Sequence, residues 1–160
     1  MSHDSLPVPG PGSLIPHLVC GGCAEAIEFY KKAFDAVETF RMPGPDGQRI
    51  MHAQIQIGGS DLFLADDFPE FCGGKSSSPK GLGGTPVTIH RYVEDCDAAI
   101  EKAVQAGATV LMPAMDAFWG DRYGSVTDPF GHNWSFATHL KDMSNDQLKS
   151  AMDEAFTQQA

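Results

Sequence analysis

The chain has 160 residues, with 11 Lys or Arg against 21 Asp or Glu, so its formal net charge is −10 at pH 7. This length suits a single domain that buries its core without disulfide staples. The negative charge would repel the phosphate backbone of a nucleic acid and an anionic membrane surface, so we expect neither as a partner.

The N-terminal stretch MSHDSLPVPGPG has no basic stretch followed by an apolar run, and no apolar run in the sequence approaches membrane-spanning length. We therefore expect no secretion signal, no membrane partner and a cytoplasmic location, where the four cysteines stay as free thiols. Residues 1–12 are expected to form a flexible N-terminal tail.

The first predicted module spans residues 13–67. The apolar run LIPHLVC predicts a strand, and residues 24–36 carry apolar side chains at helical spacing. AVETFRM predicts a second strand, PGPDGQ a turn, and the runs RIMHAQIQI and DLFLAD two more strands. The predicted order is therefore βαβββ.

Between the first strand and the helix lies Cys-Gly-Gly-Cys, with thiols at Cys20 and Cys23. A helix N-terminus favours a thiolate, so this spacing is compatible with a redox pair. A zinc site would need two further ligands, and Cys72 and Cys96 do not form a second closely spaced pair. The third interpretation is that both cysteines are packed in the core.

Residues 68–84 are rich in Gly, Ser and Pro and are interpreted as a linker to a second module at residues 85–140. Its elements are TPVTIHRYV, the helix DAAIEKAVQAG, TVLMPA, GSVTD and NWSFATH, and a C-terminal helix is predicted within residues 141–160. Cys23 and Ile27 recur at the same separation as Cys96 and Ile100, which indicates a duplicated unit. Cys20 is matched by Val93, which favours core packing for Cys20 over a redox role.

The runs IPHLVCGGCAEAIEFYKKAF, YVEDCDAAIEKAVQAGATVLMP and FWGDRYGSVTDPFGHNWSFATH resemble the vicinal oxygen chelate superfamily, and within it the PhnB-like glyoxalase/bleomycin resistance branch. The resemblance extends from about Leu14 to His139. It implies an α+β fold of two tandem βαβββ modules that form a cupped, incomplete-barrel sheet, and it implies a homodimer. The superfamily contains metal-dependent isomerases, lyases and dioxygenases as well as metal-free proteins that sequester antibiotics, so fold alone does not fix function.

Metal enzymes of this superfamily place one ligand on the first strand and one on the last strand of each module. The resemblance puts these four positions at Ile15, Phe63, Thr88 and Ser135. Isoleucine and phenylalanine cannot bind a divalent cation, so we expect no metal and no other cofactor there. A register shift of two residues keeps the same strand face and would bring His17 and His90 to the first-strand positions instead.

The resemblance and the strand alternation together predict a cavity for a small-molecule ligand. His52 and Gln54 form a polar stripe along a strand whose alternate residues are apolar. Trp119 lies in a predicted loop and either covers the cavity mouth or fills a packing gap, while Asp121 and Arg122 are an alternative ion pair within that loop. The predicted ligand-binding residues are His17, His52, Gln54, His90, Trp119, Arg122, Tyr123 and Ser135.

Two functions follow from these predictions. The first is a binding module that holds a small organic molecule in the cupped cavity without a metal ion. The second is a glyoxalase-like, metal-dependent lyase, isomerase or dioxygenase in which a divalent metal uses relocated ligands, namely His17, His52 and His90, or in which a histidine acts as general base.

Overall fold

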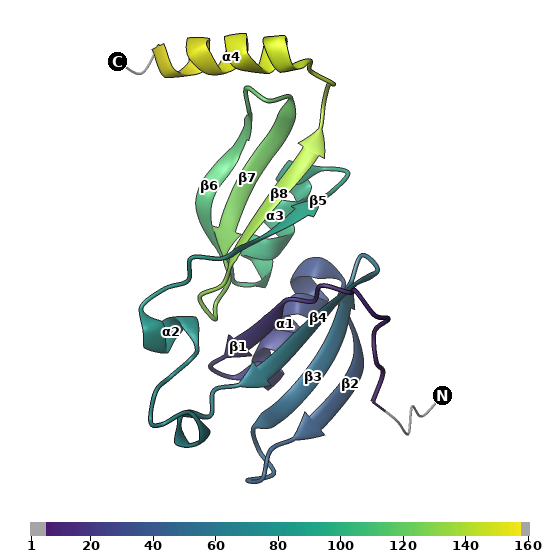
Figure 1. Cartoon of the computed structure of the whole chain (residues 1–160), viewed down its shortest axis with the longest axis vertical. Coiled ribbons are helices and arrows are strands. Elements are labelled where there is room, and N and C mark those ends of the chain that lie inside the picture. The colour runs from purple at the N-terminus through teal and green to yellow at the C-terminus, as the bar shows by residue number, and fades with distance from the viewer. Residues whose placement is uncertain (1–5, 158–160) are drawn as a thin grey trace.

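The computed structural model describes residues 6–157 and contains two four-stranded sheets, each with a helix against one face (Figure 1). Sheet A has the order β1-β4-β3-β2 and sheet B the order β5-β8-β7-β6, which confirms the duplicated βαβββ arrangement. The elements of the first module are β1 (His17–Cys20), α1 (Cys23–Phe34), β2 (Val37–Pro43), β3 (Ile50–Ile57) and β4 (Ser60–Asp66). Those of the second are β5 (Thr88–Tyr92), α3 (Cys96–Ala106), β6 (Thr109–Asp116), β7 (Asp121–Thr127) and β8 (Asn133–His139).

In each sheet the first strand pairs in parallel with the last strand, and the remaining pairs are antiparallel. A parallel pair requires a long crossover, which the intervening helix and strands supply. This topology leaves β1 and β5 at sheet edges. The first strand of each module is therefore directly beside its last strand, which decides the register of the site described below.

The two helices begin at equivalent cysteines, Cys23 and Cys96, and both thiols are buried. At the start of α1 the carboxylate of Asp66 accepts hydrogen bonds from the backbone N–H groups of Gly22 (3.1 Å) and Cys23 (2.8 Å). Asp95 caps α3 by accepting from the backbone N–H of Ala98 (2.9 Å). Negative groups at these ends complement the helix dipole and satisfy amide groups that have no partner within the helix.

The two modules are joined by an aromatic core rather than by the linker alone. Phe34 of α1 contacts the rings of Trp134 (centroids 4.5 Å apart) and Phe136 (5.8 Å) of β8, and Tyr30 contacts Trp134 at 5.4 Å. These contacts therefore run from the helix of the first module to the last strand of the second. Tyr30 also donates a hydrogen bond to Asp128 in the turn before β8 (2.6 Å).

Two short helices interrupt the predicted linker, η1 (Pro69–Phe71) and α2 (Pro79–Leu82). They escaped prediction because three or four residues cannot establish a helical periodicity. The C-terminal helix α4 (Asn145–Thr157) begins after Ser144, whose hydroxyl accepts from the backbone N–H of Gln147, and it lies beyond the end of β8, away from sheet A (Figure 1). None of the helices within residues 6–157 is long and apolar enough to cross a membrane.

The predicted tail and C-terminal helix extend past the described residues, because residues 1–5 and 158–160 lie outside them. Within the described part of the tail, the carbonyl of Pro7 accepts a hydrogen bond from the side chain of Gln54 (3.1 Å). The N-terminal segment therefore contacts the strand face that carries the predicted polar stripe.

Candidate functional site

The Cys-Gly-Gly-Cys stretch has the character of a packed core. Cys20 and Cys23 are fully buried, and both thiols are free. Burial raises the pKa of Cys23 to about 12 and also raises the pKa of Cys20. The N-terminal end of α1 would stabilise a thiolate, but the carboxylate of Asp66 already occupies it. The redox interpretation is therefore not supported, and core packing explains both residues.

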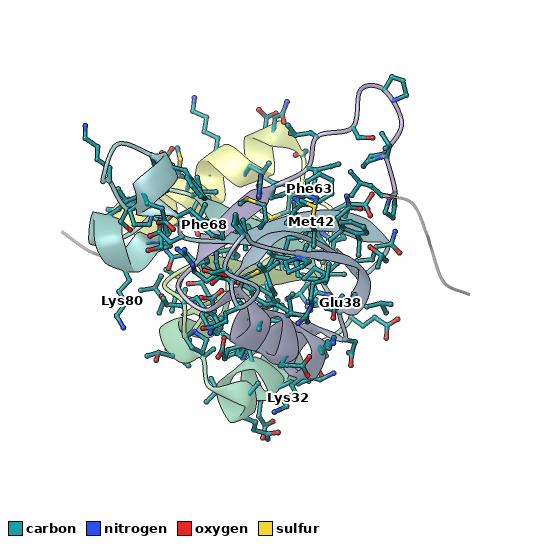
Figure 2. All side chains as sticks on the ribbon, turned by 90° about the horizontal axis from the view of Figure 1, so that it is seen from below. Lys32, Glu38, Met42, Phe63, Phe68 and Lys80 are labelled. Carbon is teal, nitrogen blue, oxygen red and sulfur yellow. The ribbon has the colours of Figure 1, made fainter. Side chains whose placement is uncertain are left out.

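On sheet A, four candidate side chains share the face turned away from α1. The register pairs His17 with Phe63, and Phe63 with Gln54, while His52 lies two residues before Gln54 on the same strand. The rings of His17 and His52 are 5.8 Å apart, and Phe63 contacts the ring of His52 at 4.9 Å. Figure 2 shows Phe63 and Met42 on this side of the sheet and Lys32 of α1 on the other.

Gln54 links this group to the N-terminal segment. Its side chain is buried, and its amide nitrogen lies 3.1 Å from the carbonyl of Pro7 and 3.2 Å from Nε2 of His52. An amide nitrogen can only donate, so Nε2 of His52 is the acceptor and the ring is neutral. Burial lowers the pKa of His17, and burial together with His17 lowers the pKa of His52. Both imidazoles are thus in the form that binds metals or accepts protons.

On sheet B, the equivalent face carries His90 and Ser135. Nδ1 of His90 lies 2.7 Å from the hydroxyl of Ser135, which is buried beneath it. The ring of Tyr123 is stacked against His90 (centroids 6.0 Å apart), and Tyr92 contacts it edge-on at 5.0 Å. The serine fixes the orientation of the histidine, and both tyrosines add aromatic surface around its ring.

Asp121 organises the end of this face and was not among the predicted site residues. Its carboxylate is 5 % exposed and accepts hydrogen bonds from Nε1 of Trp119 (3.1 Å), the hydroxyl of Tyr92 (3.2 Å) and Nδ1 of His139 (2.9 Å). The alternation of Asp121 and Tyr123 at the start of β7 could have revealed it, but this stretch was interpreted as a loop. Trp119 is therefore held at the edge of the site by a fixed hydrogen bond.

Arg122 does not join the other predicted residues. As the neighbour of Asp121 and Tyr123 on a strand, it points to the opposite face of sheet B. There its guanidinium pairs with Asp97 (2.6 and 2.8 Å) and Asp116 (3.0 Å), so the ion pair expected between Asp121 and Arg122 is not formed.

The sequence of the two modules matches a known protein superfamily. Residues 14–136 match the model of the Glyoxalase/Bleomycin resistance protein/Dioxygenase superfamily. The chain belongs to this superfamily.

Similar proteins match most of the length of the chain. An uncharacterized protein of Mycobacterium bovis, Mb0911c, is 53% identical over 140 residues, which cover 88% of this chain and 91% of the relative. The crystal structure of the Arabidopsis thaliana product At5g48480 superposes with a TM-score of 0.61 at 29% identity, covering 81% of this chain and 99% of that chain. A PhnB protein from Bacillus cereus shares the fold at 15% identity, with a TM-score of 0.57 and coverage of 81% and 99%.

The strand pairing shows which first-strand residues lie beside the two expected last-strand positions, Phe63 and Ser135. His17 lies beside Phe63 and His90 beside Ser135, whereas Ile15 precedes β1 and Thr88 pairs with Asn133. A slip of two residues keeps the same face and leaves the alternation of polar and apolar residues unchanged. In this alternative register, with His17 and His90 at the first-strand positions, the four positions hold two histidines, one phenylalanine and one serine.

This set fits a metal ion poorly. Phe63 has no ligand atom and lies against both histidine rings of sheet A, at 6.2 Å from His17 and 4.9 Å from His52. Within residues 6–157, no three His, Cys, Asp or Glu side chains come together in a group that could hold a metal. The expected set of His17, His52 and His90 is divided between the two sheets of one chain.

A cavity of about 580 Å³ lies between the modules, and of the eight predicted site residues it contains His90. The predicted site residues other than Arg122 thus form two half-sites, the sheet A face and the sheet B face, and His90 of the second also lines the cavity between the modules.

Proposed function

We propose that the protein binds a small, planar organic molecule against the strand faces of its sheets without a metal ion. The observation that carries this proposal is the contact of Phe63, which the resemblance places at a superfamily ligand position, with the rings of His17 and His52. An aromatic ring at that point excludes a cation and supplies an apolar surface. Tyr123 and Trp119, whose rings are 5.4 Å apart, extend such a surface on sheet B. Polar atoms of Gln54 and Ser135 are placed to orient a bound molecule.

The proposed binding unit is a homodimer. The strand face of sheet B carries exposed apolar and aromatic side chains at Tyr92 (66% exposed), Met115 (52%) and Met112 (42%). Surfaces of this kind, together with the free sheet edges at β1 and β5, are commonly covered by a second copy. A second copy over either face would close an open half-site into a cavity.

The three buried free thiols also suit a reducing cytoplasm.

The test uses the fluorescence of Trp119 with two-ring planar aromatics, beginning with the neutral probe 2-naphthol. Binding should quench Trp119, and Trp119→Ala should weaken binding measured by calorimetry by ~1–3 kcal/mol, as for a central aromatic contact. Arg122→Gln is the matched control, because Arg122 lies on the opposite face and should leave binding unchanged. The proposal would be contradicted if no two-ring planar aromatic bound in a saturable way. It would also be contradicted if the Trp119→Ala variant bound the probe with the same affinity as the wild-type protein.

One observation favours the alternative of a metal-dependent lyase, isomerase or dioxygenase. The rings of His17 and His52 are 5.8 Å apart, and the pKa of each is lowered by burial. Two neutral imidazoles are two of the ligands that such a centre needs, and His90 of a second copy would be the third. Stoichiometric zinc, nickel, manganese or iron in the purified protein, lost in both His17→Ala and His90→Ala, would replace the metal-free proposal with this one.

A further inference from the structure

Arg91 on β5 differs from the other three arginines of the chain. Arg41 pairs with Glu38 (2.5 Å), Arg49 pairs with Asp46 (2.6 Å) and Glu70, and Arg122 pairs with two aspartates. Arg91 makes no ion pair and no side-chain hydrogen bond to any residue in the range 6–157, although the protein carries an excess of acidic residues.

The described residues around Arg91 partly shield its guanidinium from water, but none of them pairs with it as a counter-ion. Its guanidinium lies over the ring of Phe34, 5.3 Å from the centroid, and burial lowers the pKa of Arg91. The acidic neighbour Asp35 is itself bonded to Lys102 (2.5 Å) and is highly exposed. A half-buried cation of this kind has lost part of its hydration and gains from any anion that can reach it.

Arg91 also lines the cavity of about 580 Å³ between the modules. Apolar side chains form much of its wall, among them Ile15, Ile57, Leu62 and Ile89. At the turn between β3 and β4, Gly58 has no side chain, and a Cβ built there would be 3.9 Å from Nη2 of Arg91. The guanidinium therefore faces a space with room for a ligand and with apolar surface for the ligand's body.

A carboxylate in the cavity wall, Asp61, decides the kind of anion. Asp61 lies in the wall and accepts a hydrogen bond from Gln56 (3.0 Å), so a carboxylate shares the cavity with Arg91. A doubly charged phosphate monoester would be repelled more strongly by Asp61 than a singly charged carboxylate. His90 and Tyr92 at the β5 edge offer further hydrogen-bonding groups.

We propose that the cavity between the modules binds a small organic carboxylate, with its anionic group on Arg91 and its apolar body against Ile57 and Ile89. A guanidinium matches a carboxylate with two parallel N–H···O hydrogen bonds. This site goes beyond the proposed function and shares only His90 with the predicted strand-face residues, so either can fail without the other.

The experiment follows the methyl NMR signals of Ile57 and Ile89 in the full chain while four probes are added: benzoate, phenyl phosphate, inorganic phosphate and benzyl alcohol. Benzoate should shift both methyl signals in a saturable way at low millimolar concentration. Benzyl alcohol has the same size without the charge and should bind at least ~10-fold more weakly, because a charge-assisted pair is lost. Phenyl phosphate should bind more weakly than benzoate, and inorganic phosphate should give no saturable shift.

Variants then assign the binding to Arg91. Arg91→Gln should weaken benzoate binding at least ~10-fold, Arg91→Lys less, and Asp61→Asn should tighten it. The matched control is Arg41→Gln, which removes an ion-paired arginine outside the cavity and should leave binding unchanged. Equal binding of benzoate and benzyl alcohol by the wild-type protein would overturn the proposal without any variant. So would the absence of saturable shifts up to about 20 mM benzoate, or unchanged binding in a folded Arg91→Gln protein.

Discussion

Asp128, in the turn before β8, is the most highly bonded carboxylate at the seam between modules. It is 4% exposed and accepts hydrogen bonds from the hydroxyl of Tyr30 (2.6 Å), Nε1 of Trp134 (2.9 Å) and the backbone N–H groups of Phe130 (2.9 Å) and His132 (3.0 Å). Tyr30 comes from the first module and the other donors from the second. Replacement of Asp128 by alanine therefore tests whether this carboxylate holds the modules together.

The magnitude follows from the donors that the substitution leaves unpaired. Tyr30 is 0% exposed and Trp134 is 1% exposed, so neither donor can turn to water. Each buried donor without a partner costs ~1–3 kcal/mol, and the two turn amides add a smaller amount. Asp128→Ala should lower the free energy of unfolding by ~3–5 kcal/mol, which is a large part of the stability of a typical domain.

Tyr30→Phe gives the sharper test because its effect should change sign. In the wild-type background it removes a hydrogen bond to a charged group and should destabilise by ~1–2 kcal/mol. In the Asp128→Ala background it removes a hydroxyl that has no partner and should stabilise by ~1 kcal/mol.

Urea denaturation followed by circular dichroism measures all four proteins, with Asp61→Ala near the start of β4 as the control for loss of a carboxylate. The control should change stability by no more than ~0.5 kcal/mol. A cost below ~1 kcal/mol for Asp128→Ala, or the same effect of Tyr30→Phe in both backgrounds, would refute the reasoning.

Three further predictions concern thiols, pH and assembly. Cys72 is exposed and should react with a thiol reagent at once, whereas Cys23, with its pKa raised to about 12 by burial, should react only at the rate of unfolding; a fast reaction of Cys23 would restore the redox interpretation. Hydrogen bonds to Asp121 and Asp142 raise the pKa of His139 above 6.5, so its contribution to stability should be full below about pH 6.5 and be lost as the pH rises through the raised value. An NMR titration of His139, and the loss of this pH dependence in His139→Gln, check that sign. Light scattering should give a dimer at micromolar concentration, and a monomer would count against the proposed assembly.

The repeat made most of the fold predictable. The recurrence of Cys23 and Ile27 as Cys96 and Ile100 located both helices within one residue of their observed starts and fixed the βαβββ order. The ends of strands were less predictable, since β1 begins at His17 and Leu14 is 97% exposed despite its apolar side chain. Sequence alternation indicates which residues share a face but does not show where hydrogen-bonded pairing begins.

The sequence predicted which residues share a strand face, but not which residues lie beside one another on neighbouring strands. His52 and Gln54 were expected on one polar stripe and do share a face, because a period of two is directly visible in the sequence. The pairing of His17 with Phe63 depends on contacts between residues far apart in the chain, which no local pattern contains. Arg122 was misplaced because β7 starts at Asp121, three residues before the predicted strand GSVTD, so that the arginine is a strand residue that points to the opposite face.

The turn that holds Asp128 is longer than the equivalent turn of the first module. Residues 128–132 separate the paired residues Thr127 and Asn133, whereas in the first module only Gly58 and Gly59 separate Ile57 from Ser60. The two-glycine turn of the first module therefore contains no carboxylate at the place where the second module has Asp128. The bond therefore runs in one direction, from Tyr30 of the first module to Asp128 of the second, and two copies of the first module alone would lack its acceptor.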